Sequence, residues 1–251
     1  MKSRFLGVLT AAALAASSAF AANLGTDTAA DAVYNDGLQN GDNGGSGFNA
    51  WSLAVQGTGG GFIGDAVGQG FGDINDPSGA GGEAWGFFGN PAGANGINAD
   101  RTFDGGALTV GQTFLIDLAI AFRNGNKGID LDVGGTGVWN FNVGSDLYTV
   151  NGVDLGWSYS QTSIFELSVT ATGAGTYDVT LTRGSDVFNQ SYANGGTGID
   201  GFGLYVFGTD AGDDRNNLFV NNLAIVPEPS TIVLGLVGAL GLVAARRRMQ
   251  K

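Results

Sequence analysis

The chain has 251 residues, a formal net charge of −12, and neither cysteine nor histidine. Without these two residue types it has no disulfide, no Ser-His-Asp triad, no cysteine nucleophile and no ordinary zinc site. Residues 22–226 hold five basic side chains against 22 acidic ones, a net charge of −17. We therefore expect no nucleic-acid partner, because phosphates are bound mainly by Lys and Arg.

Residues 1–21 have the pattern of a secretory signal peptide. Lys2 and Arg4 form the charged start, Phe5–Ala16 is a short apolar run, and Ala19-Phe20-Ala21 fits the small-x-small cleavage pattern. The alternative is an N-terminal membrane anchor, but the apolar run is shorter than the roughly 20 residues that cross a bilayer. We predict an exported protein whose mature form begins near residue 22.

Residues 22–225 are predicted to form one glycine-rich domain of β-strands. Short runs of alternating hydrophobic and polar residues are separated by turn residues, and only Thr26–Val33 has room for one or two helical turns. Glycine is densest in residues 35–82, where we expect long surface loops. The predicted strands are Trp51–Gln56, Phe62–Ala66, Ala84–Phe88, Arg101–Phe103, Gln112–Phe122, Ile129–Val133, Val138–Val143, Leu147–Val150, Trp157–Ser160, Phe165–Thr170, Tyr177–Thr182, Val187–Tyr192, Phe202–Phe207 and Leu218–Ile225.

The strongest local prediction is a hairpin, because Phe165–Thr170 and Tyr177–Thr182 flank a loop that contains two glycines. About a dozen short strands favour an all-β fold, an antiparallel β-sandwich of the jelly-roll type. The pattern resembles the concanavalin A-like lectins. A β-solenoid is the rival architecture, but the chain lacks the fixed repeat that solenoids need.

Two loops cluster oxygen ligands of the kind that calcium prefers. The candidate ligands are Asp73, Asn75 and Asp76 in the first loop, and Asp210, Asp213 and Asp214 in the second. A structural calcium ion is the one cofactor that we predict, for a domain that is strongly acidic and has no disulfides. The alternative is that these residues form turns, for which Asp and Asn are well suited.

Trp85 and Trp157 are candidates for stacking on sugar rings. Each lies beside a glycine, Gly86 or Gly156, near an expected strand end, which favours exposure of the indole. The alternative is that both belong to the core, where most aromatic side chains of a sandwich lie.

Carboxylates are the remaining candidates for catalysis. Concanavalin-like glycosidases place theirs as Glu-x-Asp-x-x-Glu on one strand, and this pattern is absent. Asp130-Leu131-Asp132 presents two carboxylates on one strand face, but the sequence shows no third partner. We therefore predict no enzyme activity and assign no catalytic residue.

The tail, residues 226–251, has three parts. Residues 226–231 read Val-Pro-Glu-Pro-Ser-Thr, residues 232–245 are apolar, and residues 246–251 are mainly basic. The prolines end the preceding strand, since proline cannot donate to a strand ladder. We predict a short transmembrane helix over residues 232–245, about 22 Å long, with Arg246, Arg247 and Arg248 on the cytoplasmic side. The alternative is a buried core helix, which three consecutive arginines disfavour.

This tail resembles the PEP-CTERM family of sorting signals in its motif, its apolar segment and its terminal arginines. The resemblance implies an exosortase, a membrane-embedded processing enzyme of Gram-negative bacteria that make exopolysaccharide. It implies cleavage near Pro227, Glu228 and Pro229, after transient anchoring in the inner membrane. The expected partners are the secretion machinery and the exosortase, and the expected destination is the cell surface or the extracellular matrix.

Three functions remain open for the domain between the two signals. The first is a non-catalytic structural or adhesive component of the cell surface or of the exopolysaccharide matrix of a biofilm. The second is a carbohydrate-binding module that uses an aromatic groove, with or without calcium. The third, a glycan-active enzyme that works with carboxylates alone, is the least favoured. The sequence identifies neither a ligand nor an oligomeric state.

Overall fold

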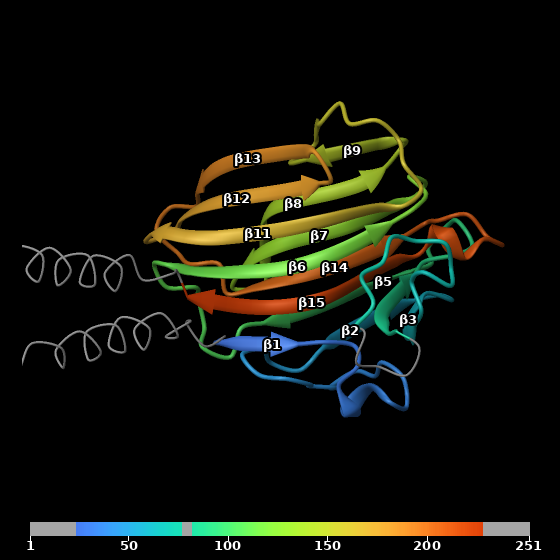
Figure 1. Ribbon diagram of the computed structural model, residues 1–251, viewed down its shortest axis with the longest axis horizontal. Helices are drawn as coiled ribbons and strands as arrows, with labels where there is room; N and C mark the ends of the chain where they lie inside the picture. Colours follow the sequence, from blue (N-terminus) through green and yellow to red (C-terminus); the bar gives the residue numbers. More distant parts are fainter. Residues whose placement is uncertain (1–23, 77–81, 228–251) are drawn as a thin grey trace, which may run out of the picture. The chain divides into compact units, whose positions relative to one another are not determined.

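The computed structural model describes residues 24–76 and 82–227 (Figure 1). The predicted signal peptide, Glu228 and Pro229, the expected helix over residues 232–245 and Arg246–Arg248 lie outside the described residues. Within the described ranges, no helix is long and apolar enough to span a membrane. Leu24–Val226 form one compact unit with its own core, so we expect this segment to fold alone.

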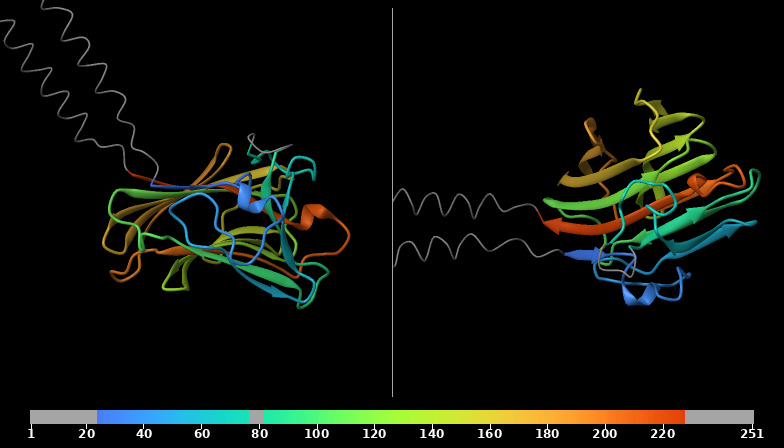
Figure 2. Two further views of the ribbon diagram at one scale, coloured as in Figure 1. Left: turned by 90° about the horizontal axis from the view of Figure 1, so that it is seen from below. Right: turned by 45° about the vertical axis from the view of Figure 1, so that its right-hand side comes forward.

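The described chain forms two antiparallel sheets that face each other, as the left view of Figure 2 shows. We call them the β6 sheet and the β14 sheet. The β6 sheet has the order β13 (Asp186–Ala193), β12 (Thr176–Arg183), β11 (Ser163–Gly173), β6 (Gln112–Ile120), β15 (Leu218–Pro227), β4 (Ala84–Phe88) and β3 (Gly60–Gly64), and β1 (Gly25–Asp27) pairs with β15. The β14 sheet has the order β10 (Val153–Asp154), β9 (Leu147–Val150), β8 (Thr136–Gly144), β7 (Asn126–Val133), β14 (Gly201–Phe207), β5 (Gly96–Thr102) and β2 (Ser52–Gln56).

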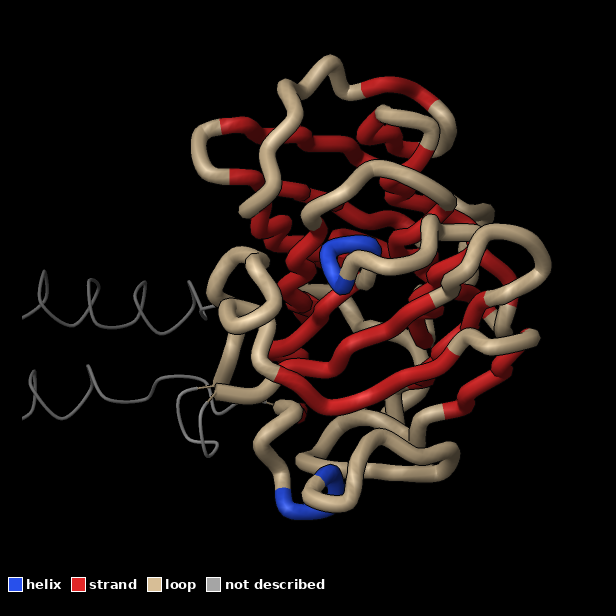
Figure 3. Tube along the Cα trace, turned by 90° about the vertical axis from the view of Figure 1, so that its right-hand side faces the viewer, coloured by secondary structure: helices blue, strands red, loops and turns tan. Residues whose placement is uncertain are grey.

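The core lies between the sheets and follows the alternation of the strands. Phe114, Ile116 and Leu118 of β6 are fully buried, as are Phe202 and Val206 of β14. Apart from the strands, the described chain has only two short 3-10 helices, η2 (Ala32–Tyr34) and η3 (Asp214–Asn216), drawn blue in Figure 3. The all-β sandwich that the sequence predicts is therefore confirmed.

Most strand predictions are confirmed, including the hairpin, in which Val169 pairs with Val179 and Leu167 with Leu181. The predicted strand Trp157–Ser160 is wrong, because this segment is part of the loop between β10 and β11. The helical turns allowed over Thr26–Val33 are also wrong for the most part. This stretch begins as β1 and reaches a 3-10 turn only at Ala32.

Part of the glycine-rich segment 35–82 is not a simple surface loop. Phe71 and Ile74 pack with Phe219 and with Ala119 into a second, smaller core. The Phe71 and Phe219 rings meet edge to face, 4.9 Å apart. This loop therefore buries apolar surface that the strands leave exposed.

The prediction that Trp85 is exposed for sugar stacking is wrong. Trp85 is fully buried, with its ring 5.3 Å from that of Tyr34 and 5.5 Å from that of Trp51. The neighbouring Gly86 does not mark a strand end. A Cβ at Gly86 would lie 2.3 Å from the Phe62 ring, so the glycine makes room for an aromatic ring on the other face of β4.

One ion pair in the core joins the two sheets. Asp27 lies on β1, at the margin of the β6 sheet, and Arg101 lies on β5 of the β14 sheet; both side chains are fully buried. The Arg101 guanidinium lies over the rings of Phe48 and Trp51, at 5.1 and 4.8 Å from their centroids. The cation is therefore held between two aromatic faces.

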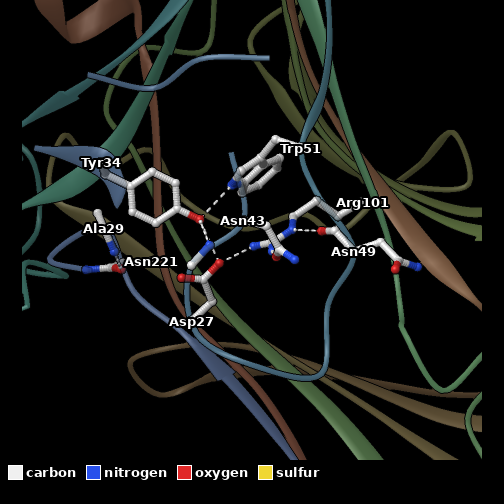
Figure 4. Close-up of polar contacts among 9 residues, drawn as sticks. Asp27, Ala29, Tyr34, Asn43, Asn49, Trp51, Arg101 and Asn221 are labelled. Atoms are coloured by element: carbon white, nitrogen blue, oxygen red, sulfur yellow. Dashed lines mark hydrogen bonds and ion pairs between the residues drawn. The ribbon is translucent and has the colours of Figure 1, made fainter. Parts of the chain in front are cut away.

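Hydrogen bonds extend this network (Figure 4), although Asp27 Oδ1 has no hydrogen-bond partner among the described residues. Tyr34 donates to Asp27 at 2.7 Å, and Trp51 Nε1 donates to the Tyr34 hydroxyl at 3.3 Å. Arg101 also donates to the Asn49 carbonyl at 2.8 Å and to Asn43 Oδ1 at 2.7 Å. Burial raises the pKa of Asp27 to about 6, an effect that Arg101 opposes. The carboxylate is thus ionised at neutral pH and the pair is intact.

We predict that Asp27→Asn destabilises the domain by about 3–5 kcal/mol, because it leaves a buried guanidinium without its carboxylate. The double variant Asp27→Asn/Arg101→Met should recover part of this loss, since it removes the uncompensated charge. Urea unfolding of residues 22–226 measures both values. Arg215→Gln, which breaks a half-exposed pair with Asp213, is the control and should cost no more than about 1 kcal/mol. A double variant as unstable as Asp27→Asn would contradict the assignment.

Candidate functional site

A polar groove lies on the outer face of the β14 sheet. It is a hollow of about 230 Å³ across β5, β14 and β7, bounded by the β7–β8 turn. The alternation that buries Ile129 and Leu131 of β7 turns Asp130 and Asp132 to this face. The groove is therefore a consequence of the same strand pattern that builds the core.

Three carboxylates surround the floor of the groove. Gly203 of β14 pairs with Asp100 of β5 on one side and with Asp130 of β7 on the other. A Cβ at Gly203 would lie 2.6 Å from Asp100 Oδ1 and 3.6 Å from Asp132 Oδ2. Because residue 203 has no side chain, the space above this part of β14 stays open, and the acidic side chains extend into that space.

Burial raises the pKa of all three groove carboxylates, and repulsion between them adds to this effect for Asp132 and Asp100. Burial raises the pKa of Asp132 to about 6, and repulsion from Asp100, Asp130 and Asp200 adds to the effect. The pKa values of Asp100 and Asp130 are raised by burial as well, and for Asp100 also by the charge of Asp130. Asp132 thus binds a proton in a pH range where an ordinary aspartate is ionised.

Tyr205 and Asn140 form a hydrogen-bonded wall of this face. Asn140 Nδ2 donates to Asp130 Oδ1 and to the Tyr205 hydroxyl, both at 2.8 Å. Tyr205 lies over Gly128, where a Cβ would lie 2.9 Å from its hydroxyl and 1.9 Å from the Phe141 carbonyl oxygen. A second glycine therefore lets an aromatic side chain lie across the neighbouring strand.

Other polar groups of the groove are free to bind a ligand. In the described part of the chain, the side chains of Asn98, Asp100 and Asp132 make no hydrogen bond to protein. Carboxylates accept hydrogen bonds and amides both donate and accept. The arrangement suits a ligand with many hydroxyl or amino donors, and it repels anions.

The predicted calcium ligands of the first loop form a turn. Asp73 accepts from the Asn75 backbone N–H at 3.2 Å, and Asn75 Nδ2 donates to Asp65 at 2.7 Å. The Asn75 side chain also accepts from the Ala66 N–H at 2.9 Å, and the Asp76 backbone pairs with Glu83. Asn75 thus organises the loop that covers the second core.

The second loop is organised in the same way. Asp213 accepts from the Arg215 backbone N–H at the start of η3 and forms an ion pair with the Arg215 side chain. Asp210 accepts from Asn124, and Asp214 belongs to η3. In residues 24–76 and 82–227, no three acidic side chains come together as a metal site. Calcium at either loop stays a prediction.

Trp157, the other predicted sugar-stacking residue, is half-buried. Its ring stacks on Phe165 at 6.3 Å and the Arg183 guanidinium lies 5.2 Å from it. It does not line the groove. Its role in sugar stacking stays a prediction.

Sequence reasoning found two of the three groove carboxylates and missed the third. Asp130 and Asp132 share one strand, so their common face follows from alternation alone. Asp100 comes from β5, which reaches the groove only because β14 pairs with both β5 and β7. The one sequence signal is the glycine at position 203, and with 46 glycines in the chain it does not stand out.

Residues 226–248 match the PEP-CTERM protein-sorting motif. The match covers the tail that the sequence singled out and leaves the sandwich unassigned. The motif implies processing by an exosortase and export to the cell envelope of a Gram-negative bacterium. No curated protein matches the chain by sequence.

Among solved structures, the chain is weakly similar to jelly-roll-like sandwiches. The receptor-binding domain of botulinum neurotoxin D is 13% identical over 87% of this chain and 53% of its own, with a TM-score of 0.39. A galectin of Caenorhabditis elegans is 13% identical over 56% of this chain and 94% of its own, with a TM-score of 0.34. The chain spans about half the length of the toxin chains that it matches.

We predict that Asp132→Asn stabilises the domain at pH 7 but not at pH 4. A folded pKa of about 6 against an ordinary value of 3.8 means that the folded state holds the extra proton between these values. The contribution of Asp132 to stability is therefore present at low pH and is lost as the pH rises through about 6. Because the side chain is half-exposed, solvent screening reduces the expected gain to about 1 kcal/mol at pH 7.

Urea unfolding at pH 4 and pH 7 measures this difference. Asp36→Asn, at an exposed site outside the groove, is the control for removing one negative charge. An equal gain in both variants, or a gain at pH 4 as large as at pH 7, would contradict a raised pKa at Asp132.

We also predict that calcium raises the melting temperature of residues 22–226, because an ion that binds only the folded state stabilises it. Asp210→Asn should reduce this rise if the second loop supplies the ligands. Identical melting in calcium and in chelator would rule out a calcium site in this segment.

Proposed function

We propose that this protein is a non-catalytic, glycan-binding component of the cell surface or exopolysaccharide matrix, and that the groove of the β14 sheet holds the glycan. The observation that supports the proposal is a set of polar side chains that make no hydrogen bond within the described residues. They surround the floor of the groove, which Gly203 leaves open. Asn98, Asp100 and Asp132 come from two different strands and face one hollow.

The chemistry of the groove supports a polyhydroxylated ligand. Each carboxylate accepts hydrogen bonds from neighbouring hydroxyl groups, and bonds to a charged acceptor are stronger than neutral ones. The strands hold these groups on a rigid scaffold, so little conformational entropy is lost when a ligand binds. The acidic surroundings favour neutral or amino sugars over acidic ones at this site.

The two terminal signals support the destination. The sorting motif implies export, and the signal peptide, the membrane-spanning tail helix and the exopolysaccharide partner remain part of the proposal. In this scheme the tail holds the protein in the inner membrane until an exosortase cuts near Pro227. The sandwich is then released or transferred with its groove exposed to polysaccharide.

The same groove supports one second candidate, carboxylate-only glycan hydrolysis. Glycoside hydrolysis needs one carboxyl group as general acid and a second as base or nucleophile. The groove offers three aspartates with raised pKa values for these roles. We propose binding rather than hydrolysis, because the chain lacks the glycosidase motif and presents no glutamate in the groove.

We predict that residues 22–226 bind neutral or amino glycans on an array, and that Gly203→Val lowers this binding at least about tenfold. The new side chain fills the floor, and its Cβ meets the ends of the Asp100 and Asp132 side chains rather than backbone, so the fold should tolerate it. Gly105→Val is the matched control, since a Cβ there meets nothing within 4 Å, and it should leave binding unchanged.

Two outcomes would overturn the proposal. If no glycan binds at any calcium concentration, the groove is not a glycan site. If a bound oligosaccharide is cleaved and Asp132→Asn abolishes the cleavage, the protein is a hydrolase and the second candidate replaces the first.

A further inference from the structure

Arg123 is the one basic side chain of the described residues without a polar partner. The described residues include five basic side chains, and three of them form ion pairs: Arg101 with Asp27, Arg183 with Asp186, and Arg215 with Asp213. Lys127 is buried and donates to the Phe122 carbonyl at 2.8 Å and to Asn124 Oδ1 at 3.3 Å. The Arg123 side chain makes neither a hydrogen bond nor an ion pair within the described ranges, and its Nε is buried without a partner. In a domain with 22 acids this is unexpected.

The guanidinium of Arg123 is nevertheless held in place. It lies over two tyrosine rings, 5.2 Å from the centroid of Tyr148 and 4.9 Å from that of Tyr159. Tyr148 is fully buried and its hydroxyl also lacks a hydrogen-bond partner among the described residues, whereas Tyr159 is 44% exposed. The aromatic contacts fix the plane of the guanidinium and leave its N–H donors unused.

The loop that carries Arg123 is fixed on both sides. On one side, the Phe122 N–H donates to the Arg215 carbonyl at 3.1 Å, and the Phe122 carbonyl accepts from Lys127. On the other side, Asn124 Nδ2 donates to Asp210 at 2.9 Å and to Asn216 at 2.7 Å. The position of Arg123 is therefore set before any ligand binds, which lowers the entropic cost of binding.

A pocket of about 290 Å³ opens beside Arg123. Phe122, Tyr159, Asn124 and Asp146 complete its lining. This volume is at the lower end of the range for small-ligand sites, of about 300–1,000 Å³, and suits one sugar ring. The pocket combines a guanidinium fork, an exposed aromatic ring and one carboxylate acceptor.

We propose that this pocket binds the carboxylate group of an acidic sugar, a hexuronate residue of a polysaccharide. The free N–H donors of Arg123 match a carboxylate in a two-point pairing. The exposed face of Tyr159 offers a platform for the sugar ring, and Asp146 accepts from ring hydroxyls. Asp146 and the net charge of the domain disfavour a dianionic phosphate relative to a singly charged carboxylate.

A second source of carboxylate is an aspartate of another copy of this chain. The uronate is favoured because the pocket has the size of one ring, and because a uronate brings ring hydroxyls for Asp146 and a ring face for Tyr159, which an aspartate side chain lacks. The site does not depend on the groove of the β14 sheet, since no residue lines both.

The test is isothermal titration calorimetry of residues 22–226 with trigalacturonate and with its fully methyl-esterified form, which has the same rings without the charge. We expect the charged form to bind at least about tenfold more tightly. Arg123→Gln should remove this preference, and Arg123→Lys should restore little of it, because lysine lacks the planar fork. Arg215→Gln, which removes a paired arginine near the same loop, is the matched control and should keep the preference.

Tyr159→Ala gives a second test should Arg123→Gln fail to fold, because Tyr159 is exposed; it should weaken binding of both ligands. Gly203→Val should leave trigalacturonate binding unchanged, which separates this site from the proposed function. Absence of binding at millimolar trigalacturonate, equal affinity for the two ligands, or an equal loss in Arg215→Gln would overturn the proposal. A dimer in sedimentation that Arg123→Gln abolishes would overturn it as well and assign Arg123 to a second copy.

Discussion

The buried pair of Asp27 and Arg101 is the contact on which the arrangement of the two sheets depends. Its two partners come from opposite sheets, and a buried charge is tolerated only where it is paired and hydrogen-bonded. Tyr34 donates to Asp27, the Asn49 carbonyl accepts from Arg101, and Trp51 in turn donates to Tyr34, so the chain segment before β2 is drawn into the core. Ala29 of the same segment donates its N–H to the Asn221 side chain of β15 at 3.1 Å. Asn221 also donates to the carbonyls of Ile74 and Glu83. In a domain without disulfides, these polar contacts tie residues 24–51 to both sheets.

Glycine shapes the outer faces of the sandwich as much as its turns. Gly86 makes room for the Phe62 ring, Gly128 for Tyr205 and Gly203 for Asp100. In each case, because glycine has no side chain, a side chain from a neighbouring strand can lie across the sheet. The result on the β14 sheet is a groove whose floor is backbone and whose walls are polar, which is the basis for the proposed glycan site.

The distribution of charge separates two kinds of binding surface. Three acids with raised pKa values lie in the groove, whereas the pocket beside the β6–β7 loop contains an arginine without a carboxylate partner. Residues 22–226 carry a net charge of −17, and at physiological ionic strength the long-range field of this charge is screened beyond about 8 Å. Local groups therefore decide which ligand each site takes. In our two proposals the first site binds a neutral or amino sugar and the second a uronate, so one polysaccharide with both kinds of residue would satisfy both.

The sequence by itself determined the all-β class, most strands and the sorting tail, because alternation, turn residues and the tail motif are local patterns. It also placed Asp130 and Asp132 on one face, since period 2 is a property of a single strand. Only the tertiary structure decided that Asp100 joins them, that Trp85 is buried, and that Arg123 has no acidic partner among the described residues. These facts depend on which strands pair and on what packs against each face. Such pairings join residues far apart in the chain, and the pattern within a strand does not specify its neighbour. Local chemistry therefore gave the fold class, and long-range pairing gave the sites.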